Sequence, residues 1–323
     1  MRLDNLLSLI RGTLRTSPQI SEFDNITIRA SKVKRGSLFI AVNRFDIDEA
    51  VANGAYGIIY ERNTITPNDD ETAWIEVADI YNALKRIIRF LLIDKDIRTY
   101  RCDTLTLDIA KRFATKNDLI ILQGSLSENF TKLLGAKPDT VLFFESSTIN
   151  DTLFSDAKRL QVVSQKNITY LKSTLFESKF LYKNALYEID RLSPLFVPAV
   201  AAVIDTLQRH AISFQIRSFA GFEHFVPKFV DRSLHVKEFG TSEQVLIFET
   251  HATLFEQQIA FLQERTPWAN SIVLLKKDIE DEATLFRILG KKRYNFAYLG
   301  GFRPDILTTA HIHFEAKQLQ FAF

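Results

Sequence analysis

The chain has 323 residues, of which 46% are hydrophobic and 25% charged, as in ordinary globular proteins. Its net charge of +2, with acids and bases interspersed, argues against a dedicated nucleic-acid-binding surface. A single cysteine, Cys102, excludes an intramolecular disulfide and fits a reducing compartment, so we expect a cytoplasmic location. This length can bury a substantial core and predicts two domains.

Residues 1–14, MRLDNLLSLIRGTL, have the apolar spacing of an amphipathic helix. The pattern is interrupted by Asp4, Asn5 and Arg11. The segment is too short and too charged for a signal peptide or a membrane span. We therefore expect no membrane span.

Residues 26–61 predict a small α/β unit. A first strand leads into a short basic turn with Gly36, then the apolar strand LFIAV (38–42), a helix over 48–55 and a strand over 56–61. A break rich in proline, asparagine and aspartate follows at 67–70. The composition and spacing fit a β-α-β arrangement.

The next segments also alternate between short apolar runs and helix-length stretches. We expect a helix over 80–92 and strands near 98–101, 119–122 and 141–146. This alternation favours parallel βαβ connections, so the fold class is α/β, with a mainly parallel, helix-flanked sheet after the small first domain. We place the domains at 1–95 and 96–323. After residue 277, a helix (280–289) and strands such as 296–299 and 311–314 are expected to complete the second sheet rather than form a third domain.

The residue pattern of 26–61 resembles that of the N-terminal domain of the Mur ligase family, which builds the peptide stem of peptidoglycan. Arg29, Ala30 and Ser31 stand where the family has Asp, Ser and Arg. The framework positions that match are Val33, Lys34, Gly36, Leu38, Phe39, Ala41, Ala50, Gly54, Ala55 and Glu61. The resemblance implies a Mur-ligase-like N-terminal domain over 1–95 and a degenerate Mur-ligase central-like domain over 96–323.

In the resembled family, the turn that corresponds to residues 31–36 faces a uridine diphosphate group. The residues that would bind it here are Ser31, Lys32, Lys34, Arg35 and Gly36. Their cations could hold a diphosphate electrostatically. An ordinary solvated turn is the alternative. The partners implied are a weakly bound UDP-sugar or muropeptide precursor, or a cell-wall synthesis protein.

The family also carries a glycine-rich ATP loop, close to TG-x-NGKT/S, where its second domain begins. Residues 102–113 occupy that place here and contain no glycine. A second candidate is Gly124 with Ser125, but Glu128 would repel a phosphate there. Glu249 and His251 lie where the family has a strand with acidic residues and the turn that holds adenine and ribose. These four residues are possible relics of a nucleotide site, and we predict no cofactor.

Each remaining candidate has a functional and a structural interpretation. Glu249 and His251 at a strand end could form an acid/base pair or could be exposed relics. His311 and His313 could ligate a metal with Glu315 nearby, or could belong to a solvated strand face. Cys102 lacks a local base, and its neighbour Asp103 raises the thiol pKa, so it is not expected to act as a nucleophile. We predict no catalytic residue and no metal ligand.

Three functions stay open from the sequence. The first is a degenerate Mur-ligase-like protein of cell-wall precursor metabolism that has lost ATP-dependent amide ligation and acts as a binding or interaction module. The second is an active ATP-dependent UDP-MurNAc-peptide ligase with an unorthodox nucleotide site. The third is an unrelated α/β binding protein, because a fold does not establish a function.

Overall fold

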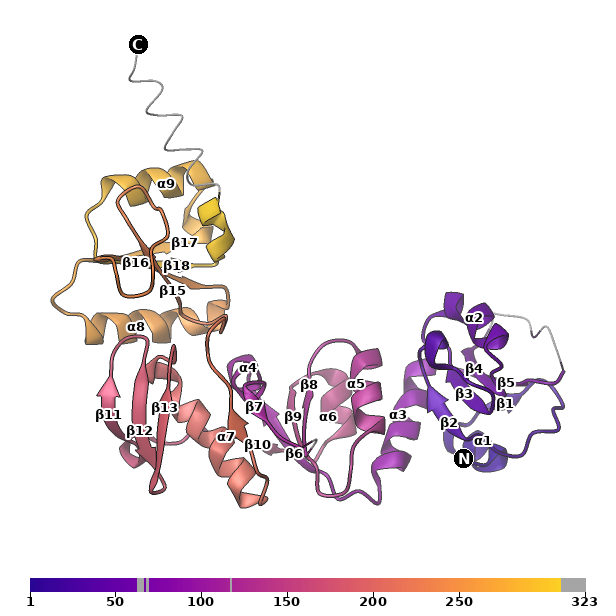
Figure 1. Cartoon of the computed structure of the whole chain (residues 1–323). Helices are drawn as coiled ribbons and strands as arrows, with labels where there is room; N and C mark the ends of the chain where they lie inside the picture. Colours follow the sequence, from indigo (N-terminus) through magenta and orange to yellow (C-terminus); the bar gives the residue numbers. More distant parts are fainter. Residues whose placement is uncertain (63–66, 68–69, 117, 309–323) are drawn as a thin grey trace, which may run out of the picture. The chain divides into compact units, whose positions relative to one another are not determined.

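The computed structural model describes residues 1–62, 67, 70–116 and 118–308. Its helices and strands confirm the α/β class, with helix-flanked sheets that are mainly parallel (Figure 1). The chain forms two compact units. Unit 1 comprises Met1–Leu160 with Thr206–Gln215, and unit 2 comprises Gln161–Asp205 with Ile216–Phe323. The division at residues 95 and 96 falls inside unit 1 and stays a prediction.

The first sheet of unit 1 has the strand order β1-β5-β4-β3-β2. Its pairs are parallel except for β1 with β5. The predicted order of elements in residues 26–61 is confirmed. The strands are β1 (Thr13–Leu14), β2 (Asn25–Thr27), β3 (Ser37–Ile40), β4 (Gly57–Glu61) and β5 (Ala73–Val77), and the helices are α1 (Leu3–Ile10) and α2 (Ile47–Ala52).

Both faces of this sheet are buried, which explains the continuous apolar run in β3. Leu38 and Ile40 belong to a core cluster with α1 and α3 (Ile80–Leu92), whereas Phe39 belongs to a second cluster with α2. Alternate side chains of one strand therefore pack on opposite faces, as parallel sheets require. Helix α3 begins where predicted because Asp79 accepts hydrogen bonds from the backbone N–H groups of Tyr81 and Asn82.

The second sheet of unit 1 is wholly parallel, in the order β10-β6-β9-β8. Helix α3 and helix α5 contribute to one core cluster, together with Leu142 and Phe144 of this sheet. The strands are β6 (Arg98–Cys102), β8 (Leu119–Leu122), β9 (Val141–Glu145) and β10 (Lys158–Arg159), and the helices are α4 (Thr104–Ala110), α5 (Leu126–Leu134) and α6 (Thr148–Leu153). The short strands β7 (Phe113–Ala114) and β14 (Gln215–Ile216) lie outside this sheet.

Unit 2 contains an antiparallel sheet of β11 (Thr169–Ser173), β12 (Ser178–Tyr182) and β13 (Ala185–Ile189). Helix α7 (Val197–Arg209) follows it in the chain and belongs to unit 2 up to Asp205. Every described residue of α7 from Val197 to Ile204 is buried, in keeping with its run of small and apolar side chains.

The last sheet has the order β15-β16-β18-β17 and is parallel except for β15. The expectation that the end of the chain completes the second sheet is therefore wrong. Strands β17 and β18 pair in a sheet that already begins upstream, and the predicted strand at 311–314 lies outside the described residues. The elements are β15 (Val226–Val230), β16 (Gln244–Glu249), β17 (Ser271–Leu275), β18 (Phe296–Gly300), α8 (Phe255–Arg265) and α9 (Glu282–Lys291).

Among the described residues, no helix has the length and apolar character needed to cross a membrane.

Candidate functional site

The carboxyl end of β16 carries a buried glutamate, Glu249, whose side chain is wholly removed from solvent. Strands β16, β18 and β17 run parallel, so their carboxyl ends meet at one edge of the sheet. This is the edge at which α/β folds assemble their sites. The backbone is tied there as well, because Gly301 N–H donates to the Glu249 carbonyl at 2.7 Å.

Each carboxylate oxygen of Glu249 accepts hydrogen bonds from fixed donors. Oε1 accepts from the backbone N–H groups of Thr250 and His251, both at 2.9 Å. Oε2 accepts from Gln258 Nε2 at 2.6 Å and from the Phe225 N–H at 3.3 Å. The Tyr298 hydroxyl donates to Gln258 Oε1 at 2.9 Å, so the carboxylate is oriented from both α8 and β18.

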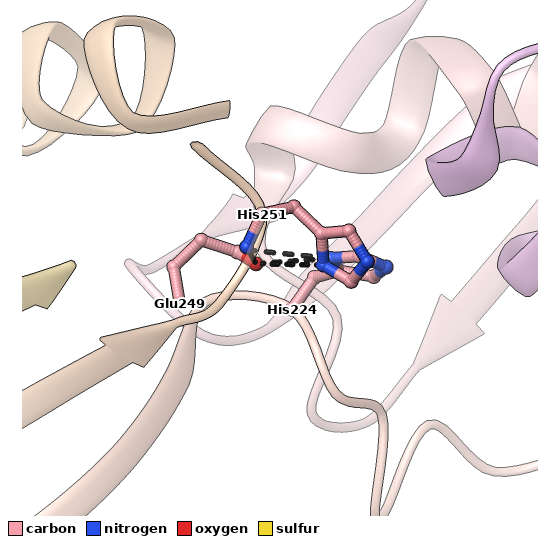
Figure 2. A group of neighbouring side chains, drawn as sticks. All are labelled: His224, Glu249 and His251. Carbon is pink, nitrogen blue, oxygen red and sulfur yellow. Dashed lines mark hydrogen bonds and ion pairs between the residues drawn. The ribbon is translucent and has the colours of Figure 1, made fainter. Parts of the chain in front are cut away.

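Two imidazoles converge on the same carboxylate (Figure 2). His224 Nδ1 lies 3.3 Å from both oxygens, and His251 Nδ1 lies 3.2 Å from Oε1. The two ring centroids are 4.8 Å apart. The His224 side chain is fully buried, whereas that of His251 is 38% exposed, so the group reaches solvent on the His251 side.

The Glu249 carboxyl is held in its ionised form. Burial raises its pKa, but the hydrogen bonds from His224, the His251 N–H and Gln258 outweigh burial, and the pKa lies below its usual range. Burial and the neighbouring Glu249 charge raise the pKa of Tyr298, which keeps its hydroxyl protonated as a donor. The result is a buried negative charge with imidazoles as its ion-pair partners.

The structure brings the predicted Glu249 and His251 together and adds His224 to them. His224 lies 25 residues before Glu249 in the chain. The signal that could have found it is strand pairing: the antiparallel register sets Val226 opposite Phe248, which carries His224 to the end of β16. Phe225 has a φ of 51°, in a region that bulky residues rarely adopt, and this is where the chain turns from His224 into β15.

The predicted diphosphate turn is built from a short 3-10 helix, Ala30–Lys32, and the glycine that precedes β3. Ser31, Lys32, Lys34 and Arg35 are exposed, and Gly36 is buried. Gly36 has a φ of +89°, and a Cβ there would overlap the Asp24 carboxylate, so glycine is required for both reasons.

Only part of this turn is fixed by side-chain bonds. The Lys34 N–H donates to Ser37 Oγ at 2.8 Å, and Arg35 Nε donates to the Tyr56 hydroxyl at 3.0 Å. These bonds hold the backbone and one guanidinium in place, while the cationic ends stay at the surface.

The second predicted relic, Gly124 with Ser125, forms the turn between β8 and α5. Ser125 Oγ accepts from the Glu128 N–H at 3.3 Å, and Glu128 Oε2 accepts from the Ser125 N–H at 3.2 Å. This reciprocal capping box places a carboxylate on an amide at the start of the helix. Gly124 has a φ of +95°, and a Cβ there would overlap Glu128 Oε2.

The turn between β6 and α4 lies in the segment 102–113, where the sequence resemblance placed an ATP loop. Carboxylates of the chain itself accept hydrogen bonds at this turn as well. Asp103 Oδ1 accepts from the Thr106 N–H at 2.7 Å. The Thr104 hydroxyl donates to Glu145 Oε1, at the end of the neighbouring strand β9, at 2.6 Å. Cys102 beside this turn is buried, and burial together with Asp103 raises its pKa to about 12.

The predicted site residues thus fall into separate places. The 31–36 turn and the Gly124 turn belong to different sheets of unit 1, and Glu249 with His251 belongs to unit 2. His311 and His313 lie outside the described residues.

Comparison with solved structures finds the same architecture over almost the whole chain. Crystal structure I of MurF from Acinetobacter baumannii has a TM-score of 0.54 and 11% identity, covering 97% of this chain and 88% of that one. A structure of UDP-N-acetylmuramoylalanyl-D-glutamyl-2,6-diaminopimelate–D-alanyl-D-alanyl ligase from the same organism has a TM-score of 0.52 and 12% identity, covering 99% and 91%. The chain has a Mur-ligase-like fold. By sequence, no protein-family model and no curated protein matches it.

The last sheet begins at β15, well before residue 277. The number of residues after 277 therefore could not show whether the chain forms a further sheet.

Proposed function

We propose that this chain is a Mur-ligase-like protein of peptidoglycan precursor metabolism that no longer couples ATP to amide ligation and acts as a binding or interaction module. The observation that carries the proposal is the occupation of two helix starts in unit 1 by the chain's own carboxylates, those of Asp103 and Glu128. A cytoplasmic location is part of the proposal and is supported by the free, buried thiol of Cys102.

A phosphate cradle needs backbone N–H groups that point at the phosphate and a lysine that neutralises it. At the β8–α5 turn, the Ser125 N–H already donates to Glu128. Two unit charges 4 Å apart interact by about 4 kcal/mol at an effective dielectric constant of 20, so Glu128 opposes a phosphate strongly. Both the geometry and the charge of this turn disfavour ATP.

The sheet topology also argues against ATP binding at the turn between β6 and α4. After β6, the chain passes through α4 to β8, which lies beyond β9 in the sheet. After β9, it passes through α6 to β10, which lies beyond β6 in the opposite direction. Right-handed crossovers then place α4 and α6 on opposite faces, which puts the switch point between β6 and β9. Ligands of open α/β sheets bind at such a point, and here the Thr104–Glu145 hydrogen bond bridges it.

An ADP-release assay tests the loss of ligation. The full chain is incubated with Mg-ATP, UDP-muramoyl peptides of increasing length and free amino acids or D-alanyl-D-alanine, with an authentic MurF as the positive control. We expect no substrate-dependent ADP release above the rate without protein. Release that depends on one UDP-muramoyl peptide and one amine would refute the proposal and favour an active ligase.

The ligand that the proposal assigns to the 31–36 turn is the diphosphate of a UDP-sugar or muropeptide precursor. Lys32, Lys34 and Arg35 offer exposed cations, and the Tyr56 hydroxyl positions one of them. Exposed cations with few further hydrogen-bond donors give weak binding that salt screens. We therefore expect submillimolar affinity at best, and tighter binding for a cell-wall synthesis protein that covers the same turn.

Calorimetry at low salt with UDP-N-acetylmuramic acid measures this binding. Lys34→Ala and Arg35→Ala should each weaken it, while Lys137→Ala, which removes an exposed lysine elsewhere in unit 1, should not. Charge reversal at Lys34 and Arg35 should also reduce capture of a protein partner. If low-salt calorimetry shows no binding and charge reversal leaves partner capture unchanged, the turn is only structural.

A further inference from the structure

The nitrogen and oxygen atoms of His224, Glu249 and His251 are spaced like the ligands of a metal ion. One ligand atom from each residue lies within 4.8 Å of the other two. The Nδ1-to-oxygen distances of 3.2 and 3.3 Å exceed the 2.7–2.9 Å that is usual for a charge-assisted hydrogen bond. Zinc bonds of about 2.0–2.1 Å in a tetrahedron give a ligand-to-ligand edge of about 3.3 Å, which matches these distances.

The carboxylate also accepts hydrogen bonds from groups other than the imidazoles. Gln258 at 2.6 Å and the N–H groups of Thr250 and His251 at 2.9 Å are nearer donors than either Nδ1 atom. Metal-ligating carboxylates are characteristically held by such outer partners. The Gln258–Tyr298 pair therefore has the place and chemistry of a supporting shell that orients Glu249.

The charge of the group also calls for a cation. Glu249 is fully buried, and within the described part of the chain its ion-pair partners are His224 and His251. Buried charges are characteristically paired or bound to a metal. A divalent ion among the three residues supplies that charge.

We propose that Nδ1 of His224, Nδ1 of His251 and a carboxylate oxygen of Glu249 bind one divalent transition metal of the zinc class. Two imidazoles with one carboxylate suit zinc, cobalt and their neighbours, whereas magnesium and calcium favour oxygen ligands alone. In the bound state both imidazoles carry their proton on Nε2. The fourth position faces the partly exposed His251 side, where water or an anionic group can complete the coordination.

The site is tested on the full chain after removal of metals with EDTA. Zinc content after dialysis is measured by mass spectrometry, and Co²⁺ is titrated while its visible d–d bands are recorded. We expect one ion per chain and the intense bands of four-coordinate cobalt, with zinc displacing cobalt and excess magnesium leaving it bound.

Variants separate this site from other histidines. His251→Ala should abolish stoichiometric uptake, and its partly exposed position makes it less disruptive than His224→Ala. Gln258→Ala should weaken binding about 10- to 100-fold, the range typical of outer partners. His235→Ala is the matched control, because His235 Nδ1 also lies 3.3 Å from a carboxylate, that of Asp231, but the described residues form no three-residue ligand group there.

A second control addresses the end of the chain, where the double variant His311→Ala, His313→Ala should retain full uptake. The proposal is overturned if the wild-type chain binds neither ion stoichiometrically. It is equally overturned if His251→Ala binds as well as wild type, or if uptake disappears only in the His311, His313 variant.

Discussion

Replacing Gly124 by alanine should destabilise unit 1 through two separate effects. The left-handed φ of +95° costs an L-residue about 1–2 kcal/mol. The new Cβ also overlaps Glu128 Oε2 and must displace the carboxylate from the Ser125 N–H, which forfeits a hydrogen bond of about 0.5–1.5 kcal/mol. Gly124→Ala should therefore lower the free energy of unfolding by about 2–3 kcal/mol.

Glu128→Ala isolates the second effect. Alone it should cost about 0.5–1.5 kcal/mol, the loss of the same hydrogen bond. In the double variant that loss is counted once, because the alanine at position 124 no longer meets a carboxylate. The double variant should thus be about 1 kcal/mol more stable than the sum of the two single effects predicts.

Urea unfolding followed by tryptophan fluorescence measures this cycle. The chain has two tryptophans, Trp74 buried in unit 1 and Trp268 exposed in unit 2. A Trp268→Phe background lets Trp74 report unit 1 alone. Effects that add within about 0.3 kcal/mol would show that Glu128 does not occupy the turn, and the argument against a phosphate there would fall with it.

Two further predictions concern ionisation. Burial, with Asp103 beside it, raises the pKa of the Cys102 thiol from 9.0 to about 12, so iodoacetamide at pH 8 should modify Cys102 in urea but not in the native chain. The stabilisation from this thiol is complete below pH 9 and is lost as the pH rises towards about 12. Cys102→Ala should remove that alkaline dependence of stability. Rapid modification of the native chain would contradict the burial of Cys102. For Asp231, burial raises the pKa, but hydrogen bonds from Lys237 and from the His235 and Ser233 N–H groups lower it from 3.8 to about 2. Its stabilising contribution is present above pH 3.8 and is lost as the pH falls towards about 2, so acid unfolding of Asp231→Asn should depend less steeply on pH in that range, and an unchanged slope would count against the depressed pKa.

Local patterns were sufficient for the elements whose partners are adjacent in sequence. The helix over 80–92 matches α3 because its apolar spacing and its Asp79 cap are both local signals. The strand, turn, strand, helix and strand of 26–61 were predicted for the same reason. Glu128 was expected to oppose a phosphate, and the structure adds how, through the Ser125 N–H.

Non-local pairing explains what the sequence did not predict. Strand β16 reads as an apolar strand wherever its neighbours lie, so nothing local shows that β15, β17 and β18 join it in a separate sheet. His224 is a histidine between aromatic residues, and only the register of β15 against β16 brings it to Glu249. Its ring packs against Phe222, two residues before it, and against Phe196, which is distant in sequence.

The central claim is that this Mur-ligase-like fold has no working ATP site. Isothermal titration of Mg-ATP into the full chain tests it most directly, with an authentic MurF titrated alongside as the positive control. We predict no saturable binding for this chain, because Asp103 and Glu128 already occupy the helix starts that would hold phosphates. Saturable binding in the micromolar range that is lost in Gly124→Ala would contradict the account and restore the active ligase as the better explanation.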